Sequence, residues 1–572
     1  LFRPMVVPPV EHTTHRSGGY LNHWIRKEVV HRFLSNYYTS DKHEQKFSEP
    51  SQLVLNGLNA LSHTEWSVNT KLLSVMNNMF ISNTCSANLP AYDFSGFSFQ
   101  KEYPQEGTKE TQAMWCQEKE EAWGNWFKEE QKRARMLIRL KLAESLIEED
   151  FFYMPQTLDF RGRSYTTCEL LSCQGSDFDK ALIQFAEPVT QTPQGLRWQA
   201  IHLANLFDRD KYDFDDRIKW VNDNWEMFLR IAQDPYENKE WISDKKKKNP
   251  SFQRLAVIFD ITRTDGLTQV PVQIDGKCNG TQHWSAIMGD EVNASLTNVS
   301  PNSKPKDLYA YVADKTTEYC EINEDSIDWC KEFLGHWDDG IERSVTKRPT
   351  MCDAYGLTFY GIQKYVKSEG HLDWVSKERV GGAVVELARG IQYALSETLD
   401  MPNQGKDFLR ECAEIVGRRN KHITFTTPSG FKVVHSYNIQ KNRRSLTSLF
   451  NHKELTFYTY TNEVDVRRAV LGIPPNFIHS LDAAHMFLTI SRMIENGLHQ
   501  LCFIHDSYGC PAPYVSMMRE YLREEFCKIH TENQLEKFKK EVQADVNVLL
   551  PDVPKRGDLN VESVLKSDYF FS

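Results

Sequence analysis

Two aspartates each stand directly after a short apolar run in this 572-residue sequence. Asp275 follows residues 270–274, and Asp506 follows residues 502–505. Two carboxylates held at strand ends and brought together can bind a pair of Mg²⁺ ions, the arrangement used for in-line phosphoryl displacement. A single strand-end aspartate is more often a turn or helix cap. The residues around each aspartate therefore decide which interpretation holds.

The segment after Asp275 is an unusual run of glycines and polar residues, Gly276-Lys277-Cys278-Asn279-Gly280-Thr281-Gln282-His283-Trp284. It lies where a predicted strand meets a predicted helix. The alternative is an ordinary polar loop. We favour a functional loop, because this run directly follows one of the two strand-end carboxylates.

A third group of residues, 343–356, combines cations with an aromatic side chain. Arg343, Lys347 and Tyr355 are spaced in steps of four, so on a helix they share one face. Two cations and an aromatic in one stripe could grip a triphosphate and contact a nucleoside. An exposed basic helix face is the alternative.

Proline at position 349 works against a continuous helix there, because it removes a backbone hydrogen bond and restricts the residue before it. If the helix instead begins at Pro349, as a first-turn proline allows, Lys347 lies in the entry turn. It would then leave the shared face, although helix N-termini still favour phosphate.

The elements that must position these residues can be predicted from periodicity. Helical periodicity predicts helices within 50–80 and 108–152, with a loop over 82–106. Short apolar, β-branched runs predict buried strands at 255–261 and 270–274, a strand-rich region over 422–460, and a short strand at 501–504.

Charge and composition restrict the class of protein. The net charge of -10, from 68 Lys+Arg against 78 Asp+Glu, argues as a total against nucleic-acid binding. Residues 417–455 nevertheless carry eight basic residues and one acidic residue, a local charge of +7 that leaves -17 elsewhere. The twelve cysteines form no C-x-x-C pair, so we expect buried thiols and no zinc ribbon. No apolar stretch predicts a transmembrane helix. The chain begins at Leu1 without a signal peptide, and we expect a protein truncated or processed upstream.

Residues 275–284, 343–356 and His505-Asp506-Ser507 resemble motifs A, B and C of the single-subunit DNA-dependent RNA polymerases of bacteriophages and mitochondria. Other segments agree in the same order along the chain. Residues 159–165 resemble the family's D-[WF]-R-G-R-x-Y segment and 474–482 its P-N-F-[VI]-H-S segment. Residues 4–9, 66–69 and 554–572 are also similar to the family.

The resemblance implies an α+β, mainly helical fold, the right-hand polymerase with palm, fingers and thumb and a small antiparallel palm sheet. It implies five regions along the chain: 1–107, a linker and helical region leading into the thumb; 108–150, thumb helices; 151–300, palm with motif A; 301–475, fingers with motif B and a promoter-contacting hairpin near 430–460; and 476–572, a second palm segment with motif C and a C-terminal foot.

The resemblance also implies roles for individual residues. Asp275 and Asp506, with the backbone carbonyl of Gly276, would bind two Mg²⁺ ions. The incoming NTP would be bound by Arg343, Lys347, Tyr355 and Gly356, and Lys347 and Tyr355 would join the two aspartates in catalysis. Arg163 and His479 would contact the template and hybrid, and Arg443, Arg444 and Lys453 would contact promoter DNA.

Ribonucleotides are favoured over deoxyribonucleotides by two departures from similar DNA polymerases. Those relatives have Glu where this chain has Gly280, which leaves room for a 2'-hydroxyl, and tend to have His-Asp-Glu where this chain has His505-Asp506-Ser507. The alternatives are a family A-like DNA polymerase and a nucleic-acid-binding protein with a degenerate catalytic site.

The expected partners are DNA template and promoter, RNA product and NTPs, with no membrane. A separate N-terminal subunit or an accessory initiation protein is a further possibility. We expect the cytoplasm of an infected bacterial host, with the mitochondrion as the alternative, since motif B looks phage-like while the segment at 159 and the C-terminus look more mitochondrial.

Overall fold

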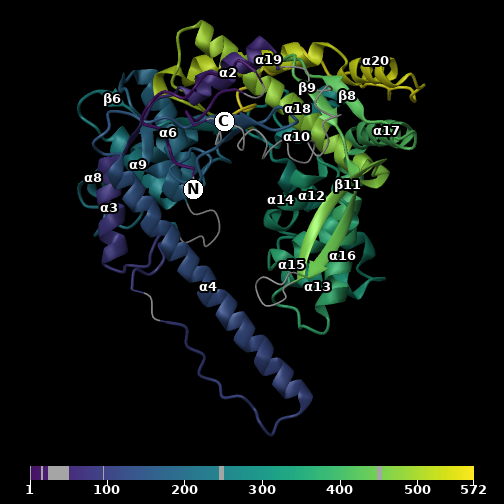
Figure 1. Cartoon of the computed structure of the whole chain (residues 1–572), viewed down its shortest axis with the longest axis horizontal. Coiled ribbons are helices and arrows are strands. Elements are labelled where there is room, and N and C mark those ends of the chain that lie inside the picture. The colour runs from purple at the N-terminus through teal and green to yellow at the C-terminus, as the bar shows by residue number, and fades with distance from the viewer. Residues whose placement is uncertain (1, 15–16, 23–49, 94–95, 244–249, 447–453) are drawn as a thin grey trace.

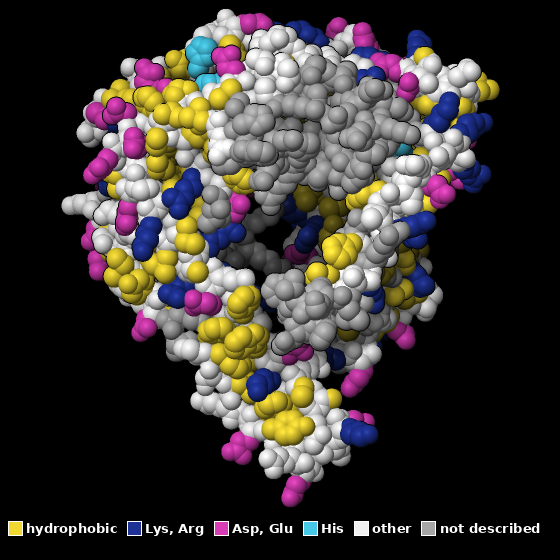
Figure 2. Space-filling view, viewed as in Figure 1, with side chains coloured by type: hydrophobic (Ala, Val, Ile, Leu, Met, Phe, Trp, Pro, Cys, Tyr) yellow, Lys and Arg dark blue, Asp and Glu magenta, His cyan; other side chains and the backbone are white. Residues whose placement is uncertain are grey.

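The structure is a computed structural model that describes every residue except 1, 15–16, 23–49, 94–95, 244–249 and 447–453. Its elements form two sides, joined by an arch of helices along the top of Figure 1. The long helix α4 (Lys109–Ser145) projects from the left-hand side toward the lower right. Figure 2 shows a hollow between the two sides, with Lys and Arg side chains visible inside it.

The first part of the chain contributes the left-hand side and the base of α4. Its elements are α2 (Gln52–Ser62), β1 (Trp66–Val68), α3 (Thr70–Ile81), α4, β2 (Gln156–Leu158), β3 (Ser164–Thr166), α5 (Asp177–Ala181), β4 (Ile183–Phe185), β5 (Val189–Thr190), α6 (Pro193–Leu206), α7 (Phe214–Asp223), α8 (Trp225–Gln233), α9 (Ser251–Ile261) and β6 (Leu267–Thr268). The predicted helices within 50–80 and 108–152 and the loop between them are confirmed.

The strand predicted at 255–261 is wrong, because these residues lie in helix α9. Nearly every side chain of α9 is buried, so the sequence shows a continuous apolar run in place of a one-sided helical pattern. The carboxylate of Asp177 accepts hydrogen bonds from the backbone N–H groups of Phe252 and Gln253 at the start of the helix. That contact comes from a distant part of the chain, which periodicity cannot reveal.

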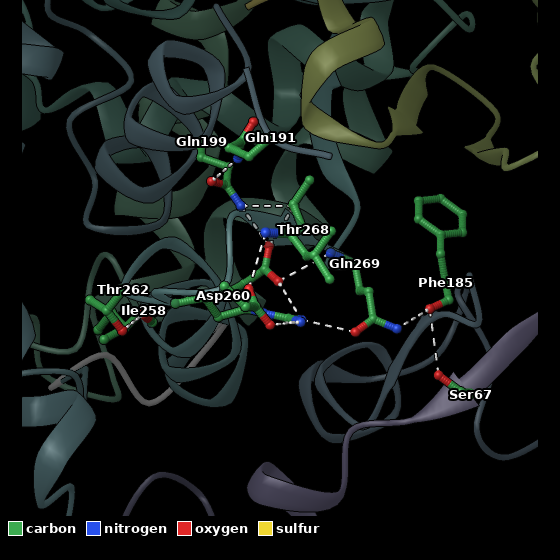
Figure 3. A network of polar contacts seen from close by, with 12 residues as sticks. Ser67, Phe185, Gln191, Gln199, Ile258, Asp260, Thr262, Thr268 and Gln269 are labelled. Atoms are coloured by element: carbon green, nitrogen blue, oxygen red, sulfur yellow. Dashed lines mark hydrogen bonds and ion pairs between the residues drawn. The ribbon is translucent and has the colours of Figure 1, made fainter. Parts of the chain in front are cut away.

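A buried polar network ties α9 to the segment that leads into the three-stranded sheet described next (Figure 3). Asp260 accepts hydrogen bonds from Gln199 Nε2 of α6 at 2.5 Å and Thr268 Oγ1 of β6 at 2.7 Å. Its other oxygen accepts from the Gln269 N–H at 3.1 Å. Burial raises the pKa of Asp260, and these donors oppose that effect. The network fixes the chain three residues before strand β7 (Val272–Asp275).

The three-stranded sheet is antiparallel and has the order β12-β13-β7. Strands β12 (Cys502–Ile504) and β13 (Ser507–Cys510) form a hairpin, and β13 pairs with β7. Gly276 also forms an isolated antiparallel bridge with Phe571, so residues near the C-terminus lie along the free edge of β7. The strands predicted at 270–274 and 501–504 are confirmed.

The middle of the chain forms a helical lobe with its own hydrophobic core, on the right of Figure 1. Its helices are α12 (Leu308–Asn323), α13 (Asp328–His336), α14 (Arg343–Asp353), α15 (Phe359–Ser368) and α16 (Val380–Thr398). The next helix, α17 (Asp400–Gly417), contributes its buried side chains to the core around the three-stranded sheet instead.

The remaining described elements come from several parts of the chain. They are α10 (Asn279–Met288), α11 (Glu291–Leu296), β8 (Ile423–Thr426), β9 (Lys432–His435), β10 (Asn438–Leu446), β11 (Glu454–Val464), α18 (Val466–Glu495), α19 (Val515–Thr531), α20 (Gln534–Val546) and the 3-10 turns at Ala512–Tyr514 and Val561–Lys566. The strand-rich region predicted over 422–460 is confirmed, as is a mainly helical fold with small antiparallel sheets. Among the described helices, none combines the length and apolar character needed to span a bilayer.

Candidate active site

The three-stranded sheet brings the two predicted aspartates together. Asp275 is the last residue of β7 and lies opposite Ser507 of β13, directly beside Asp506 in the hairpin turn. The backbone N–H of Gly276 donates to the carbonyl of Asp506 at 3.2 Å, which closes the junction. His505 takes a φ of +55° in this turn, a left-handed conformation that swings the chain sharply between the two strands.

A third carboxylate, Asp482 of α18, lies near this pair, and its negative charge is balanced by Arg163. Arg163 donates to its Oδ2 from Nη2 at 2.6 Å and from Nε at 3.0 Å, and Asn279 donates to Oδ1 at 2.7 Å. Burial, then Asp482 and Asp275, raise the pKa of Asp506 well above its ordinary value. Because Asp275 and Asp482 lie close to Asp506, a negative charge on the Asp506 carboxylate is unfavourable unless a cation is bound nearby.

The donor set at this pair suits Mg²⁺. Oxygen ligands from carboxylates and backbone carbonyls are the ones Mg²⁺ prefers, and crowded carboxylates are relieved by a bound cation. Within the described parts of the chain, no cluster of three or more His, Cys, Asp or Glu side chains is arranged to hold a metal ion. The two aspartates and the carbonyl of Gly276 offer oxygen ligands of the kind that such ions take.

The loop after Asp275 places α10 in contact with Ala354 and Tyr355 of the motif B segment. Cys278 takes a left-handed φ of +62°, and α10 begins at Asn279. At Gly280 a Cβ atom would lie 2.7 Å from Ala354 Cβ and 3.1 Å from Tyr355 Cζ. The Tyr355 ring therefore lies where a side chain at position 280 would go, and room for a 2'-hydroxyl there stays a prediction.

Helix α14 carries motif B and begins at Arg343, with Pro349 inside it. The alternative start at Pro349 is wrong. Arg343 and the half-buried Lys347 lie one turn apart near the helix N-terminus. Tyr355 comes after the helix ends at Asp353, so it leaves the predicted stripe, and Gly356 follows it with a φ of +80°.

Tyr355 lies on the imidazole of His479, with ring centroids 4.4 Å apart. His479 Nδ1 is 2.7 Å from Arg161 Nη1, and Arg161 is held in turn by Asp159. Burial, then Arg163 and Arg161, lower the pKa of His479 to about 2. His479 is therefore neutral, and its Nδ1 accepts the hydrogen bond from Arg161. These contacts fix the positions of the Tyr355 and His479 rings near Asp506.

The hairpin predicted near 430–460 is formed by β10 and β11. Arg443 lies opposite Phe457 and Arg444 opposite Thr456, and Arg444 is exposed. Lys453 lies outside the described residues.

Comparison with known proteins agrees with this geometry. Residues 190–550 match the DNA-dependent RNA polymerase family.

The chain belongs to the DNA-dependent RNA polymerase family.

Relatives within the family are organellar enzymes of plants and fungi. The chain is 29% identical over 603 residues to DNA-directed RNA polymerase 2, chloroplastic/mitochondrial, of Arabidopsis thaliana, covering 100% of this chain and 57% of that protein. It is 28% identical over 623 residues to the mitochondrial DNA-directed RNA polymerase of Schizosaccharomyces pombe, covering 100% of this chain and 52% of that protein. The chain thus spans little more than half the length of these relatives.

A solved structure, the POL domain of Pol1 from M. smegmatis in complex with DNA primer-template and dNTP, is similar at 12% identity and a TM-score of 0.39. The match covers 88% of this chain and 71% of that one.

Two acidic residues of this candidate site were not singled out from the sequence. Asp482 follows His479 by three positions in the recognised P-N-F-I-H-S-L-D segment, so its place there was the available signal. Asp307 forms an ion pair with Arg343, and no motif marks it.

Proposed function

We propose that this chain forms the catalytic region of a DNA-directed RNA polymerase that transfers nucleotidyl groups from NTPs to an RNA 3'-end on a DNA template. The observation that supports this proposal most strongly is the pairing of β7 with β13. It sets Asp275 and Asp506 side by side, near the contact between the Tyr355 and His479 rings. Family membership and the organellar RNA polymerases among the relatives agree with it.

Asp275, Asp506 and the carbonyl of Gly276 would hold Mg²⁺, which, when bound, activates the attacking 3'-hydroxyl and stabilises charge on the leaving pyrophosphate. Arg343 and Lys347, at the N-terminal end of α14, would bind the triphosphate, because guanidinium, ammonium and helix N-terminus all favour phosphate. Tyr355 and Gly356 would border the nucleoside. His479 would hold the Tyr355 ring, with Arg163 and His479 facing the template and hybrid.

The test of the proposed function is Asp506→Asn. This change removes the carboxylate charge at the pair, so NTP incorporation on a primed template should fall to background. DNA binding should be largely retained, because Asp506 contributes no positive charge to the phosphate backbone.

Ser507→Ala, which changes the neighbouring side chain, serves as the matched control and should retain synthesis. Synthesis retained in Asp506→Asn would contradict the proposal. Incorporation of dNTPs in preference to NTPs by the unaltered chain would favour the DNA polymerase alternative, and DNA binding without any incorporation would favour a binding protein with a degenerate site.

The β10–β11 hairpin is proposed to contact promoter DNA through Arg443 and Arg444, because its sequence region carries a charge of +7. Arg444→Ala should weaken binding of a promoter duplex and reduce the slope of log affinity against log salt by about 1. The control is Arg379→Ala, a change of the same kind in the helical lobe on an arginine that pairs with Glu332. An unchanged salt slope in Arg444→Ala would contradict a phosphate contact.

The relatives have mitochondrial or chloroplast names, so an organellar setting is favoured over an infected bacterial host. A separate N-terminal subunit or accessory initiation protein stays a prediction. Incorporation on primed and on duplex templates, with and without candidate partners, tests it.

A further inference from the structure

Arg343 is already engaged by a carboxylate. It is the first residue of α14, and its Nε donates to Asp307 Oδ2 at 2.5 Å while the guanidinium lies over the Tyr309 ring. Asp307 is the N-cap of α12, and its other oxygen, Oδ1, accepts from the Tyr309 N–H at 3.0 Å. One oxygen of Asp307 therefore caps a helix, and the other holds the arginine.

The same oxygen of Asp307 faces a second cation. Lys211 Nζ lies 3.6 Å from Asp307 Oδ2 and 2.7 Å from Asp210, and Lys277 Nζ lies 3.8 Å from Asp210. A row of alternating charges thus runs from α14 to the loop after Asp275. Burial alone would raise the pKa of Asp307, but Lys211 and Arg343 outweigh it and hold the pKa below its ordinary value. Asp307 is therefore a carboxylate at neutral pH.

The Asp307 carboxylate occupies the Nε donor of Arg343, one of the N–H groups that a phosphate would use, because the guanidinium binds carboxylates and phosphates through the same donors. Asp307 carries one negative charge, whereas a nucleoside triphosphate or pyrophosphate carries several. The pair is also partly exposed, with 30% of the Arg343 side chain and 18% of the Asp307 side chain accessible. The ion pair can therefore exchange with a polyphosphate at modest cost.

We propose that Asp307 is an internal competitor for the polyphosphate chain at Arg343: it yields the arginine to an incoming triphosphate and reclaims it as pyrophosphate leaves. This inference rests on the proposed function, because it assigns Arg343 to the triphosphate. Asp307 then lowers the affinity for nucleotide and for pyrophosphate together, and pyrophosphate does not remain bound after each transfer.

The test is Asp307→Asn. Asparagine is as good an N-cap as aspartate, so the cap of α12 is kept while the competing charge is lost. The dissociation constant of an α,β-methylene NTP on a primed template and the inhibition constant of inorganic pyrophosphate should both fall about twofold to fivefold, the range for a partly exposed ion pair. In an Arg343→Gln background, the same change should have a smaller effect.

Glu332→Gln is the matched control, since it removes one negative charge of an exposed ion pair with Arg379 in the same lobe. It should leave both constants unchanged. If Asp307 merely positions Arg343, Asp307→Asn will instead raise both constants, and that result, or no change, overturns the inference. A wild-type chain that binds no analogue would contradict the proposed function. If Asp307→Asn lowers the melting temperature, Asp307→Ser takes its place, because serine also caps the helix. Asp307→Ser must then give the same fall in both constants.

Discussion

Gly280 is the residue at which motif A touches motif B. Any side chain there meets Ala354 Cβ at 2.7 Å, a distance that forces one of the two helices or Tyr355 to move. We expect Gly280→Ala to destabilise the chain by about 1–3 kcal/mol. It should also raise the KM for NTP, because the Tyr355 ring is displaced from its position beside residue 280. Denaturant unfolding and steady-state incorporation measure the two effects.

The control is Gly124→Ala in the middle of α4, where a Cβ atom meets nothing within 4 Å. That change should stabilise the chain by about 0.5–1 kcal/mol, since alanine loses less backbone entropy in a helix. Gly280→Ala with unaltered KM and stability would show that the contact with Tyr355 is not needed.

Single residues were predictable where a short sequence pattern marks them. Asp275 and Asp506 each follow an apolar run, and the structure brings them together. Asp307 and Asp482 were not, because their partners Arg343 and Arg163 lie far away in the sequence and the contacts depend on packing. The close contact of Gly280 with Tyr355 was not predictable for the same reason.

Among the elements, α4 depends on one buried ion pair at its base. Arg139 of α4 donates to both oxygens of Asp179 in α5, at 2.7 and 3.0 Å, and both side chains are buried. We expect Asp179→Asn to cost about 3–5 kcal/mol, because the arginine charge is left buried without its counter-ion. Denaturant unfolding checks this value.

Glu130→Gln in the same helix removes an exposed i,i+3 partner of Arg133 and should change stability by less than about 1 kcal/mol. Similar costs for the two variants would mean that the buried pair does not anchor α4.

Elements were predicted well where hydrophobic spacing is one-sided and poorly where burial is complete. The helix α4 and the strand β7 were found from periodicity, whereas α9 was taken for a strand because its faces are all apolar. Pro349 shows a second limit. The helix α14 continues through it, supported by packing of the buried Val345 and Thr350, although local rules end the helix there.

On the scale of the whole molecule, buried neutral histidines make stability sensitive to acid. His435 donates from Nε2 to the Ala469 carbonyl at 2.8 Å and accepts at Nδ1 from Asn476 at 3.0 Å. Burial lowers the pKa of His435 and of His202 to about 4. Because the unfolded chain binds these protons first, the stability is full above pH 6.5 and is lost as the pH falls toward 4, at about 1.4 kcal/mol per pH unit for each histidine.

Urea unfolding between pH 7 and pH 5 measures this loss. His435→Gln should show a smaller decrease over that range than the unaltered chain, whereas His336→Gln, at an exposed position, should leave the decrease unchanged. Equal pH dependence in the unaltered chain and in His435→Gln would contradict a buried neutral His435.

The strand β7 has a consequence for how the molecule is made. Its two neighbours, β13 and the residues around Phe571, both come from the last part of the chain. During synthesis on a ribosome, β7 therefore emerges long before either neighbour exists, and its hydrogen-bonding edges stay unpaired. The aspartate pair can form only after these later segments have emerged, so a partly made chain carries a strand with unpaired edges, which favours aggregation.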